Sequence, residues 1–148
     1  MDHILDSIGM QIITYKYENF VTYYEEWKRT STDHNPELVK NTLLAWVLSK
    51  VSKNKNKNNN NKKMALYLLA DGASPQIALN NVAHRNDIDF IKVLLGKGAD
   101  AKEALEFLKD NRAAGFFKKT GAGEEFLRRH MLDLPEEVSK HNRSCSIM

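Results

Sequence analysis

The chain has 148 residues, of which 42% are hydrophobic and 28% are charged. These proportions are ordinary for a globular protein, and the length is that of one domain with a substantial core. The single cysteine excludes an intramolecular disulfide and fits a reducing compartment such as the cytosol. No run approaches the roughly 18 consecutive apolar residues of a spanning helix, and the acidic start Met1-Asp2-His3-Ile4-Leu5-Asp6 is unlike a secretory signal peptide.

The net charge of +3 is unevenly distributed, because one stretch without any acidic residue contains Lys50, Lys53, Lys55, Lys57, Lys62 and Lys63. Taking these six charges away from +3 leaves −3, so the rest of the chain is mildly acidic. Residues 52–63 are mainly lysine and asparagine, a bias that an AT-rich genome can also produce. Since this segment has almost nothing apolar to bury, we expect a disordered loop.

Residues 1–34 are expected to form an N-terminal helical cap. Their apolar and aromatic residues recur at amphipathic spacing: Ile8, Ile12, Ile13, Tyr15, Tyr17, Phe20, Val21, Tyr24 and Trp27. We interpret this stripe as one or two capping helices packed on the following segment, because such stripes usually belong to a core. A partner-binding groove lined by tyrosine and tryptophan is the alternative interpretation.

Helix start and stop signals recur from Asn35 onward. Asn35-Pro36 and Ser74-Pro75 each place a capping residue before a proline at the first helical position, and Asp87 and Asp100 are further N-cap candidates. A last helix is expected over residues 124–132, followed by a flexible tail to residue 148. No segment alternates apolar and polar residues with β-branched enrichment, so the sequence predicts an all-α fold.

Residues 66–74 and 92–100 form an internal repeat at an offset of 26. Both contain Leu-Leu, then Gly-Ala, then a polar capping residue, and Gly121-Ala122 is a weaker third copy. A helix ending in this way resembles the second helix and exit of an ankyrin repeat. The resemblance implies a short stack of degenerate ankyrin-like repeats over residues 35–123. The usual period is about 33 residues, and the Thr-Pro-Leu-His signature keeps only Leu79, so the β-turn finger of that family is missing.

The only cysteine begins the last four residues, Cys145-Ser146-Ile147-Met148. Cysteine, a small residue, an aliphatic residue and methionine at the carboxyl end form a prenylation (CaaX) box of the farnesyl type. We expect a farnesyl-type prenyltransferase to modify Cys145, after which Ser146, Ile147 and Met148 are removed and the new terminus is methylated. One lipid chain gives only marginal membrane binding, so the six lysines could supply a second, electrostatic signal toward an anionic leaflet.

Groups for catalysis do not form a recognisable constellation. The five histidines, His3, His34, His84, His130 and His141, are scattered, and no two have metal-ligand spacing. The short glycine pairs lack the spacing of a phosphate loop. We therefore expect no enzyme, no metal or other cofactor, and no nucleic-acid partner, because the lysine run lacks interleaved aromatic and arginine residues.

These features predict a monomeric, membrane-anchored protein–protein interaction module at the cytosolic face of a eukaryotic membrane. Ankyrin-type repeats, a Lys/Asn bias and a CaaX box together resemble the prenylated effectors of intracellular bacterial pathogens, which implies delivery to a host membrane. A protein of an AT-rich protist would suit the sequence equally. A cytoplasmic, soluble helical interaction module with a fortuitous C-terminal box is the alternative. A third reading is an enzyme or inhibitor whose site assembles only in three dimensions.

Overall fold

The computed structural model describes residues 2–32, 35–50, 54–115 and 121–133. Within these ranges the fold is all-α, with no strand, which confirms the predicted fold class. The helices are α1 (Asp2–Ile13), α2 (Tyr17–Thr30), α3 (Pro36–Ser49), α4 (Lys55–Ala70), α5 (Pro75–Val82), α6 (Ile88–Gly96), α7 (Ala101–Ala113) and α8 (Ala122–Asp133). The chain divides into two compact units, Met1–Asn81 and Val82–Met148.

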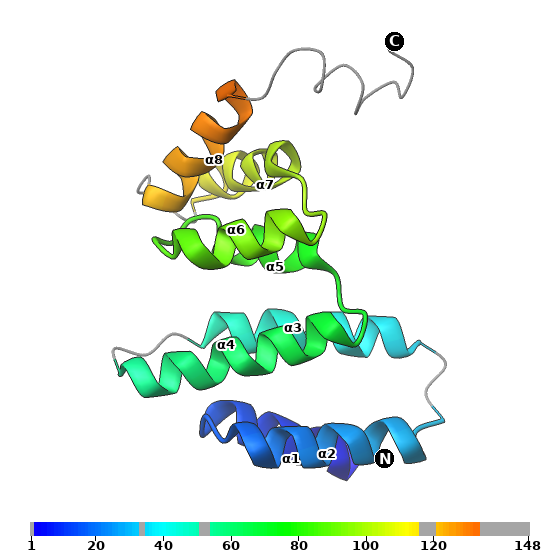
Figure 1. The fold of residues 1–148 in the computed structure, drawn as a ribbon. Coiled ribbons are helices and arrows are strands. Elements are labelled where there is room, and N and C mark those ends of the chain that lie inside the picture. Colours follow the sequence, from blue (N-terminus) through cyan, green and yellow to red (C-terminus); the bar gives the residue numbers. More distant parts are fainter. Residues whose placement is uncertain (1, 33–34, 51–53, 116–120, 134–148) are drawn as a thin grey trace. The chain divides into compact units, whose positions relative to one another are not determined.

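The first unit contains two successive helical hairpins, α1–α2 and α3–α4 (Figure 1). Aromatic residues of α2 fill much of its core: Phe20 and Tyr24 are fully buried and stacked, and Trp27 is 1% exposed. Ile8 and Ile12 of α1 are also fully buried. Most of the predicted amphipathic stripe is therefore core, and 47% of Ile13 remains exposed at its edge.

The prediction of a disordered Lys/Asn loop is wrong for residues 55–63, which form the first turns of α4. Asn54 caps the helix, because its side-chain oxygen accepts hydrogen bonds from the amides of Asn56 and Lys57 at 2.8 and 3.3 Å. Asn61 is buried, and its amide nitrogen donates to the carbonyls of Val47, at 3.4 Å, and Lys50. The start of α4 has few apolar residues, so polar side chains make its tertiary contacts instead. Residues 52–53 of the predicted loop lie outside the described ranges.

All four predicted N-caps are confirmed, since the side chains of Asn35, Ser74, Asp87 and Asp100 accept hydrogen bonds from amides of the helices that follow them. The internal sequence repeat corresponds to two alike helix exits. The amide of Ala73 donates to the carbonyl of Leu68 at 3.0 Å. In the same way, the amide of Ala99 donates to the carbonyl of Leu94 at 3.1 Å.

Both exits need a residue in the left-handed backbone conformation, and glycine supplies it in each case. The φ angle is 104° at Gly72 and 105° at Gly98. The relation of these exits to the ankyrin family stays a prediction.

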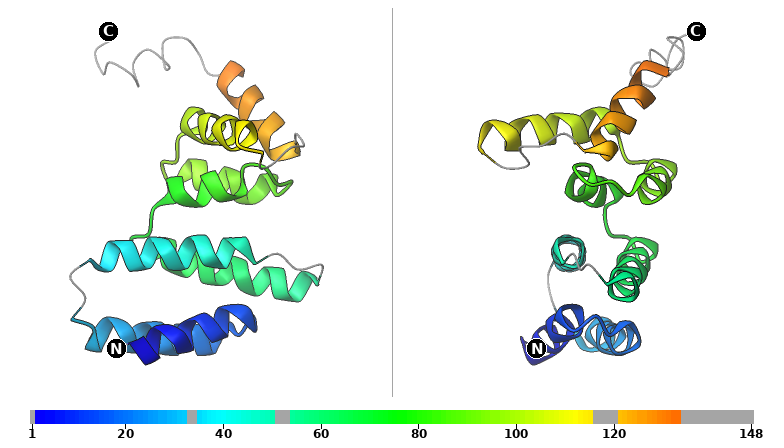
Figure 2. Two further views of the ribbon diagram at one scale, coloured as in Figure 1. Left: turned by 180° about the vertical axis from the view of Figure 1, so that it is seen from behind. Right: turned by 90° about the vertical axis from the view of Figure 1, so that its left-hand side faces the viewer.

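The second unit contains α6, α7 and α8, and Figure 2 shows α7 and α8 crossing each other. The predicted last helix at 124–132 is confirmed, and α8 begins two residues earlier. Its first turn lies on the turn after α5: the amide of Gly123 donates to the carbonyl of Arg85 at 2.8 Å, and the amide of Ala122 donates to Asn86 Oδ1 at 2.9 Å. Ile91, Leu108 and Leu127 are fully buried in this unit.

Candidate functional site

The predicted site residues divide into two groups. Cys145, Ser146, Ile147, Met148 and Lys53 lie outside the described residues. Lys50, Lys55, Lys57, Lys62 and Lys63 are described and belong to the first unit. We refer to these five lysines as the lysine face.

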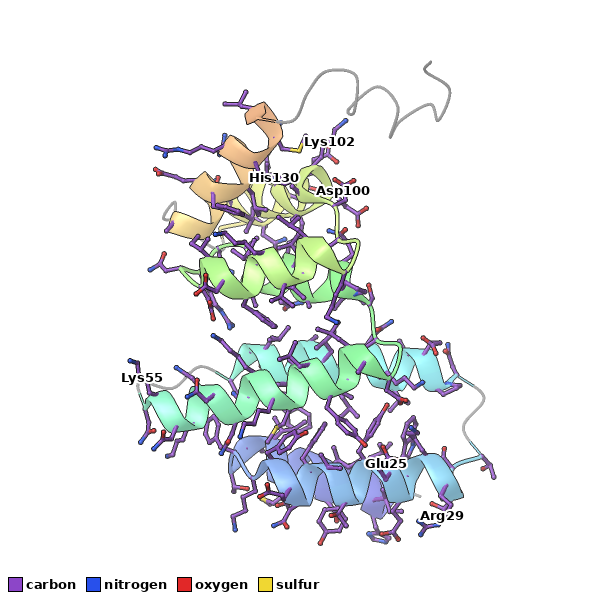
Figure 3. All side chains as sticks on the ribbon, viewed as in Figure 1. Glu25, Arg29, Lys55, Asp100, Lys102 and His130 are labelled. Atoms are coloured by element: carbon purple, nitrogen blue, oxygen red, sulfur yellow. The ribbon has the colours of Figure 1, made fainter. Side chains whose placement is uncertain are left out.

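The lysine face is built on the first turns of α4 and on the end of α3, where Lys50 is the C-cap residue. Because α4 contains no acidic residue over its 16 positions, these charges are not offset within the helix. Lys55 and Lys57 are exposed, and Figure 3 shows Lys55 projecting from the N-terminal end of α4. Residues 55–63 of the predicted lysine segment are therefore helical and carry only positive charge.

Aromatic rings contact three of these lysines. Lys57 Nζ lies 5.4 Å from the ring centre of Tyr15, Lys63 Nζ lies 5.8 Å from that of Tyr17, and Lys50 Nζ lies 5.9 Å from that of Trp46. These are cation–π distances, and they order the lysine side chains against the body of the unit. A polar hollow of 330 Å³ lies beside them, lined by Tyr15, Lys16, Tyr17, Glu18, Asn19, Asn60 and Lys63.

Tyr15 is held in an unusual backbone conformation, with φ 59° in the left-handed region. It ends α1 where glycine is the usual residue: the amide of Lys16 donates to the carbonyl of Gln11 at 2.9 Å across it. Asn60 Nδ2 also donates to the carbonyl of Tyr15 at 2.9 Å. A bulky residue here costs about 1–2 kcal/mol relative to glycine, so the ring beneath Lys57 is retained at a cost in stability.

An apolar groove of 550 Å³ lies between α1 and α3. It is lined by Leu5, Asp6, Gly9, Met10, Ile13, Leu38, Val39, Thr42, Leu43 and Trp46. Three large apolar side chains along it are exposed to solvent: Met10 by 56%, Ile13 by 47% and Leu38 by 59%. Exposed apolar residues gathered in one depression mark a binding surface more often than singly scattered ones do.

The groove meets the lysine face at Trp46, because that indole lines the groove and also lies beneath Lys50. Sequence reasoning missed the groove. The sequence pattern assigned Ile13 to the N-terminal cap and gave no surface role to the helix that begins at Pro36. The available signal was the width of the apolar face of residues 38–48, which exceeds what one helical neighbour can cover.

A charged network centred on Asp71 joins α2, α3 and the end of α4 in the first unit. Asp71 Oδ2 accepts a hydrogen bond from the Tyr24 hydroxyl at 2.6 Å, and Asp71 Oδ1 accepts one from Lys28 Nζ at 2.9 Å. Lys40 Nζ donates to the backbone carbonyl of Asp71 at 3.0 Å. Burial opposes ionisation of Asp71, but these partners outweigh it and lower the pKa of the carboxyl. This network connects α3, one of the two helices that line the groove, to α2 and to the end of α4.

The second unit has its own buried carboxylate. Glu124 is 1% exposed, and both its oxygens accept hydrogen bonds, from Arg112 and from Arg128. The hydrogen bonds from Arg112 lower the pKa of the Glu124 carboxyl. They outweigh burial, which by itself raises that pKa. His84, which follows α5, is half-buried, and burial together with the Arg85 charge lowers its pKa. We interpret Glu124 and His84 as structural residues.

Across the described residues, no helix has both the length and the apolar composition that crossing a bilayer requires. In the same part of the chain, no three His, Cys, Asp or Glu side chains are grouped to hold a metal ion. Comparison with protein-family models, curated proteins and solved structures finds no match for this chain. The features of this chain that bear on its function are the lysine face, the groove and the C-terminal box.

Proposed function

We propose that this chain is a membrane-attached protein–protein interaction module, farnesylated at Cys145 and oriented by its lysine face. The observation that carries the proposal is the ordering of the lysines on α4 over Tyr15 and Tyr17. A single lipid chain binds a membrane only reversibly, and stable attachment takes a second signal. Lysines near an anionic leaflet contribute about 1 kcal/mol each, so the lysine face is a suitable second signal.

The location that follows is the cytosolic face of a eukaryotic membrane, where prenyltransferases act and anionic lipids are enriched. For an effector delivered by a bacterium, this would be a host membrane. The alike exits of α4 and α6 support the resemblance to ankyrin-type helical hairpins, which act by binding proteins. The module would thus concentrate an unidentified protein target at the membrane surface.

The decisive experiment compares the wild-type chain with Cys145→Ser after expression in eukaryotic cells. Intact mass spectrometry of the wild type should show a farnesyl increment together with loss of residues 146–148, and the variant should show neither. Cell fractionation should place the wild type with membranes and the variant in the soluble fraction. An unmodified wild-type mass would overturn the lipid anchor.

The electrostatic signal is tested separately by replacing Lys55, Lys57, Lys62 and Lys63 with glutamine. The matched control replaces four exposed lysines of the second unit, Lys92, Lys97, Lys102 and Lys109, and so removes the same charge. The α4 variant should release farnesylated protein from membranes, and the control should not. Equal release by both variants would show that net charge alone matters.

The alternative is a soluble helical interaction module in which Cys145 stays unmodified. The observation in its favour is the apolar groove, which has the composition of surfaces that accept a partner's helix. In that case the wild type and Cys145→Ser would have the same distribution between soluble and membrane fractions.

A further inference from the structure

We propose that the groove between α1 and α3 accepts an acyl chain of an anionic phospholipid from the leaflet that the lysine face contacts. The proposal rests on the membrane location argued above but not on the farnesyl group. It gives the first unit two adjoining lipid contacts, one apolar in the groove and one electrostatic beside it.

The groove has the size and lining of a site for one lipid chain. A cavity of about 150 Å³ holds a benzene ring, or roughly 25 Å³ per carbon. At that scale the 550 Å³ of the groove has room for one acyl chain. Of the ten lining residues, only Asp6 carries a charge, and Met10, Ile13 and Leu38 present exposed apolar surface to an occupant.

Charge complementarity indicates that the acyl chain belongs to an anionic lipid. Lys50 lies over Trp46 at the boundary of the groove, where the phosphate of a lipid whose chain fills the groove would lie. Tyr15 and Tyr17, beneath Lys57 and Lys63, continue the same arrangement. Tryptophan and tyrosine rings prefer the headgroup level of a bilayer, and lysines extend from that level to the phosphates.

A bilayer is favoured over a partner protein because it satisfies both surfaces at once. A helix bound in the groove would cover Met10, Ile13 and Leu38 but would leave the basic surface beyond Trp46 without a counterpart. In an anionic leaflet the acyl layer and the phosphate layer are adjacent, as the groove and the lysine face are in this unit.

The test uses full-length Cys145→Ser protein made in bacteria, so that no lipid anchor is present. Vesicles of phosphatidylcholine alone are compared with vesicles containing about one-third phosphatidylserine, each with and without bromine on the acyl chains. Trp46 is the reporter: the chain has two tryptophans, and the other, Trp27, is only 1% exposed. We expect binding to the anionic vesicles and quenching of Trp46 by the brominated chains.

Two exposed groove residues are then replaced together, as Ile13→Gln and Leu38→Gln, with Leu66→Gln on the same unit as the matched control. Leu66 is 38% exposed and does not line the groove. Both side chains would become buried on lipid binding, so losing them should lower the partition coefficient into anionic vesicles by about tenfold. The control should change that coefficient less than about twofold. Circular dichroism checks that all three proteins remain helical.

Several outcomes would overturn the proposal. Binding without quenching of Trp46 would assign membrane contact to the lysines alone. Equal vesicle binding by the groove variant and the control would exclude the groove as a lipid site. Dimerisation of the protein that the groove substitutions abolish would show that a second copy occupies the groove instead. Because the test protein lacks Cys145, failure of farnesylation in cells cannot be mistaken for any of these results.

Discussion

Gly9 of α1 lies directly against the indole of Trp46 on α3: a Cβ built on Gly9 would be 2.5 Å from Trp46 Cη2 and 2.6 Å from Cζ3. Real side chains do not approach so closely, so the ring can occupy its place in the groove only while residue 9 is glycine. One residue on α1 therefore sets the position of the largest side chain that α3 contributes to the groove.

Gly9→Ala should displace the Trp46 ring without unfolding the unit. Alanine favours a helix interior by about 1 kcal/mol over glycine, and this gain offsets much of the lost ring packing. We expect little change in the free energy of unfolding but a red shift of the tryptophan emission as the indole leaves the groove. Gly96→Ala is the control, since nothing lies within 4 Å of its added Cβ. An unchanged emission spectrum for Gly9→Ala would contradict the packing described.

The helices and their ends were predictable because their signals are local. Asn35, Ser74, Asp87 and Asp100 act through hydrogen bonds within three residues, and the glycines at 72 and 98 act through their own φ angles. The first turns of α4 were not predictable, because their order depends on which asparagine of a run contacts α3. The groove depends on the pairing of α1 with α3, and no local pattern encodes such a pairing.

Asp71→Asn should destabilise the first unit by about 1.5–3 kcal/mol, as expected for losing hydrogen bonds to a charged group. The variant keeps the size of the side chain but weakens its bonds with Tyr24 and Lys28. Tyr24→Phe should cost less, because Lys28 still pairs with the carboxylate. Chemical denaturation of both variants and of the double variant measures the coupling; additive losses would contradict a shared network.

The pH dependence of this effect has a definite sign. Because the pKa of Asp71 is lower in the folded state, its contribution is fully present above the unfolded carboxyl pKa of about 3.9. It is lost as the pH falls through the lower, folded value. The wild type should therefore lose more stability than Asp71→Asn on acidification below about pH 4. Parallel pH profiles for the two proteins would contradict the assignment.

Glu124 should be the most sensitive charged residue of the second unit, because its carboxylate is buried between two arginines. Removing either arginine leaves the buried carboxylate with a single counter-charge, which should destabilise the unit. Arg112→Met should be more damaging than Arg128→Met, since the Arg112 side chain is 29% exposed and that of Arg128 is 60% exposed. Thermal unfolding followed by circular dichroism gives this order, and the reverse order would show that α8 is held differently.

Tyr15→Gly should raise stability and lower membrane binding at the same time. Glycine relieves the left-handed backbone at φ 59°, which should add about 1 kcal/mol to the free energy of unfolding. It also removes the ring beneath Lys57, so partitioning into anionic vesicles should weaken. Denaturation and vesicle flotation of the same protein measure both quantities. Stabilisation with unchanged vesicle binding would mean that Tyr15 has no role in the lysine face.

Asn61→Ala should uncouple the start of α4 from the end of α3. The variant loses the amide that donates to the carbonyls of Val47 and Lys50, and a lost hydrogen bond of this kind costs about 0.5–1.5 kcal/mol. Hydrogen exchange across residues 55–63 should then become faster, because a helix start with few tertiary contacts frays more readily when one of them is lost. Asn59→Ala is the matched control, since Asn59 is exposed on the same turn. If the two variants exchange alike, Asn61 is not the residue that orders the lysine face, and membrane binding by Asn61→Ala should then equal that of the wild type.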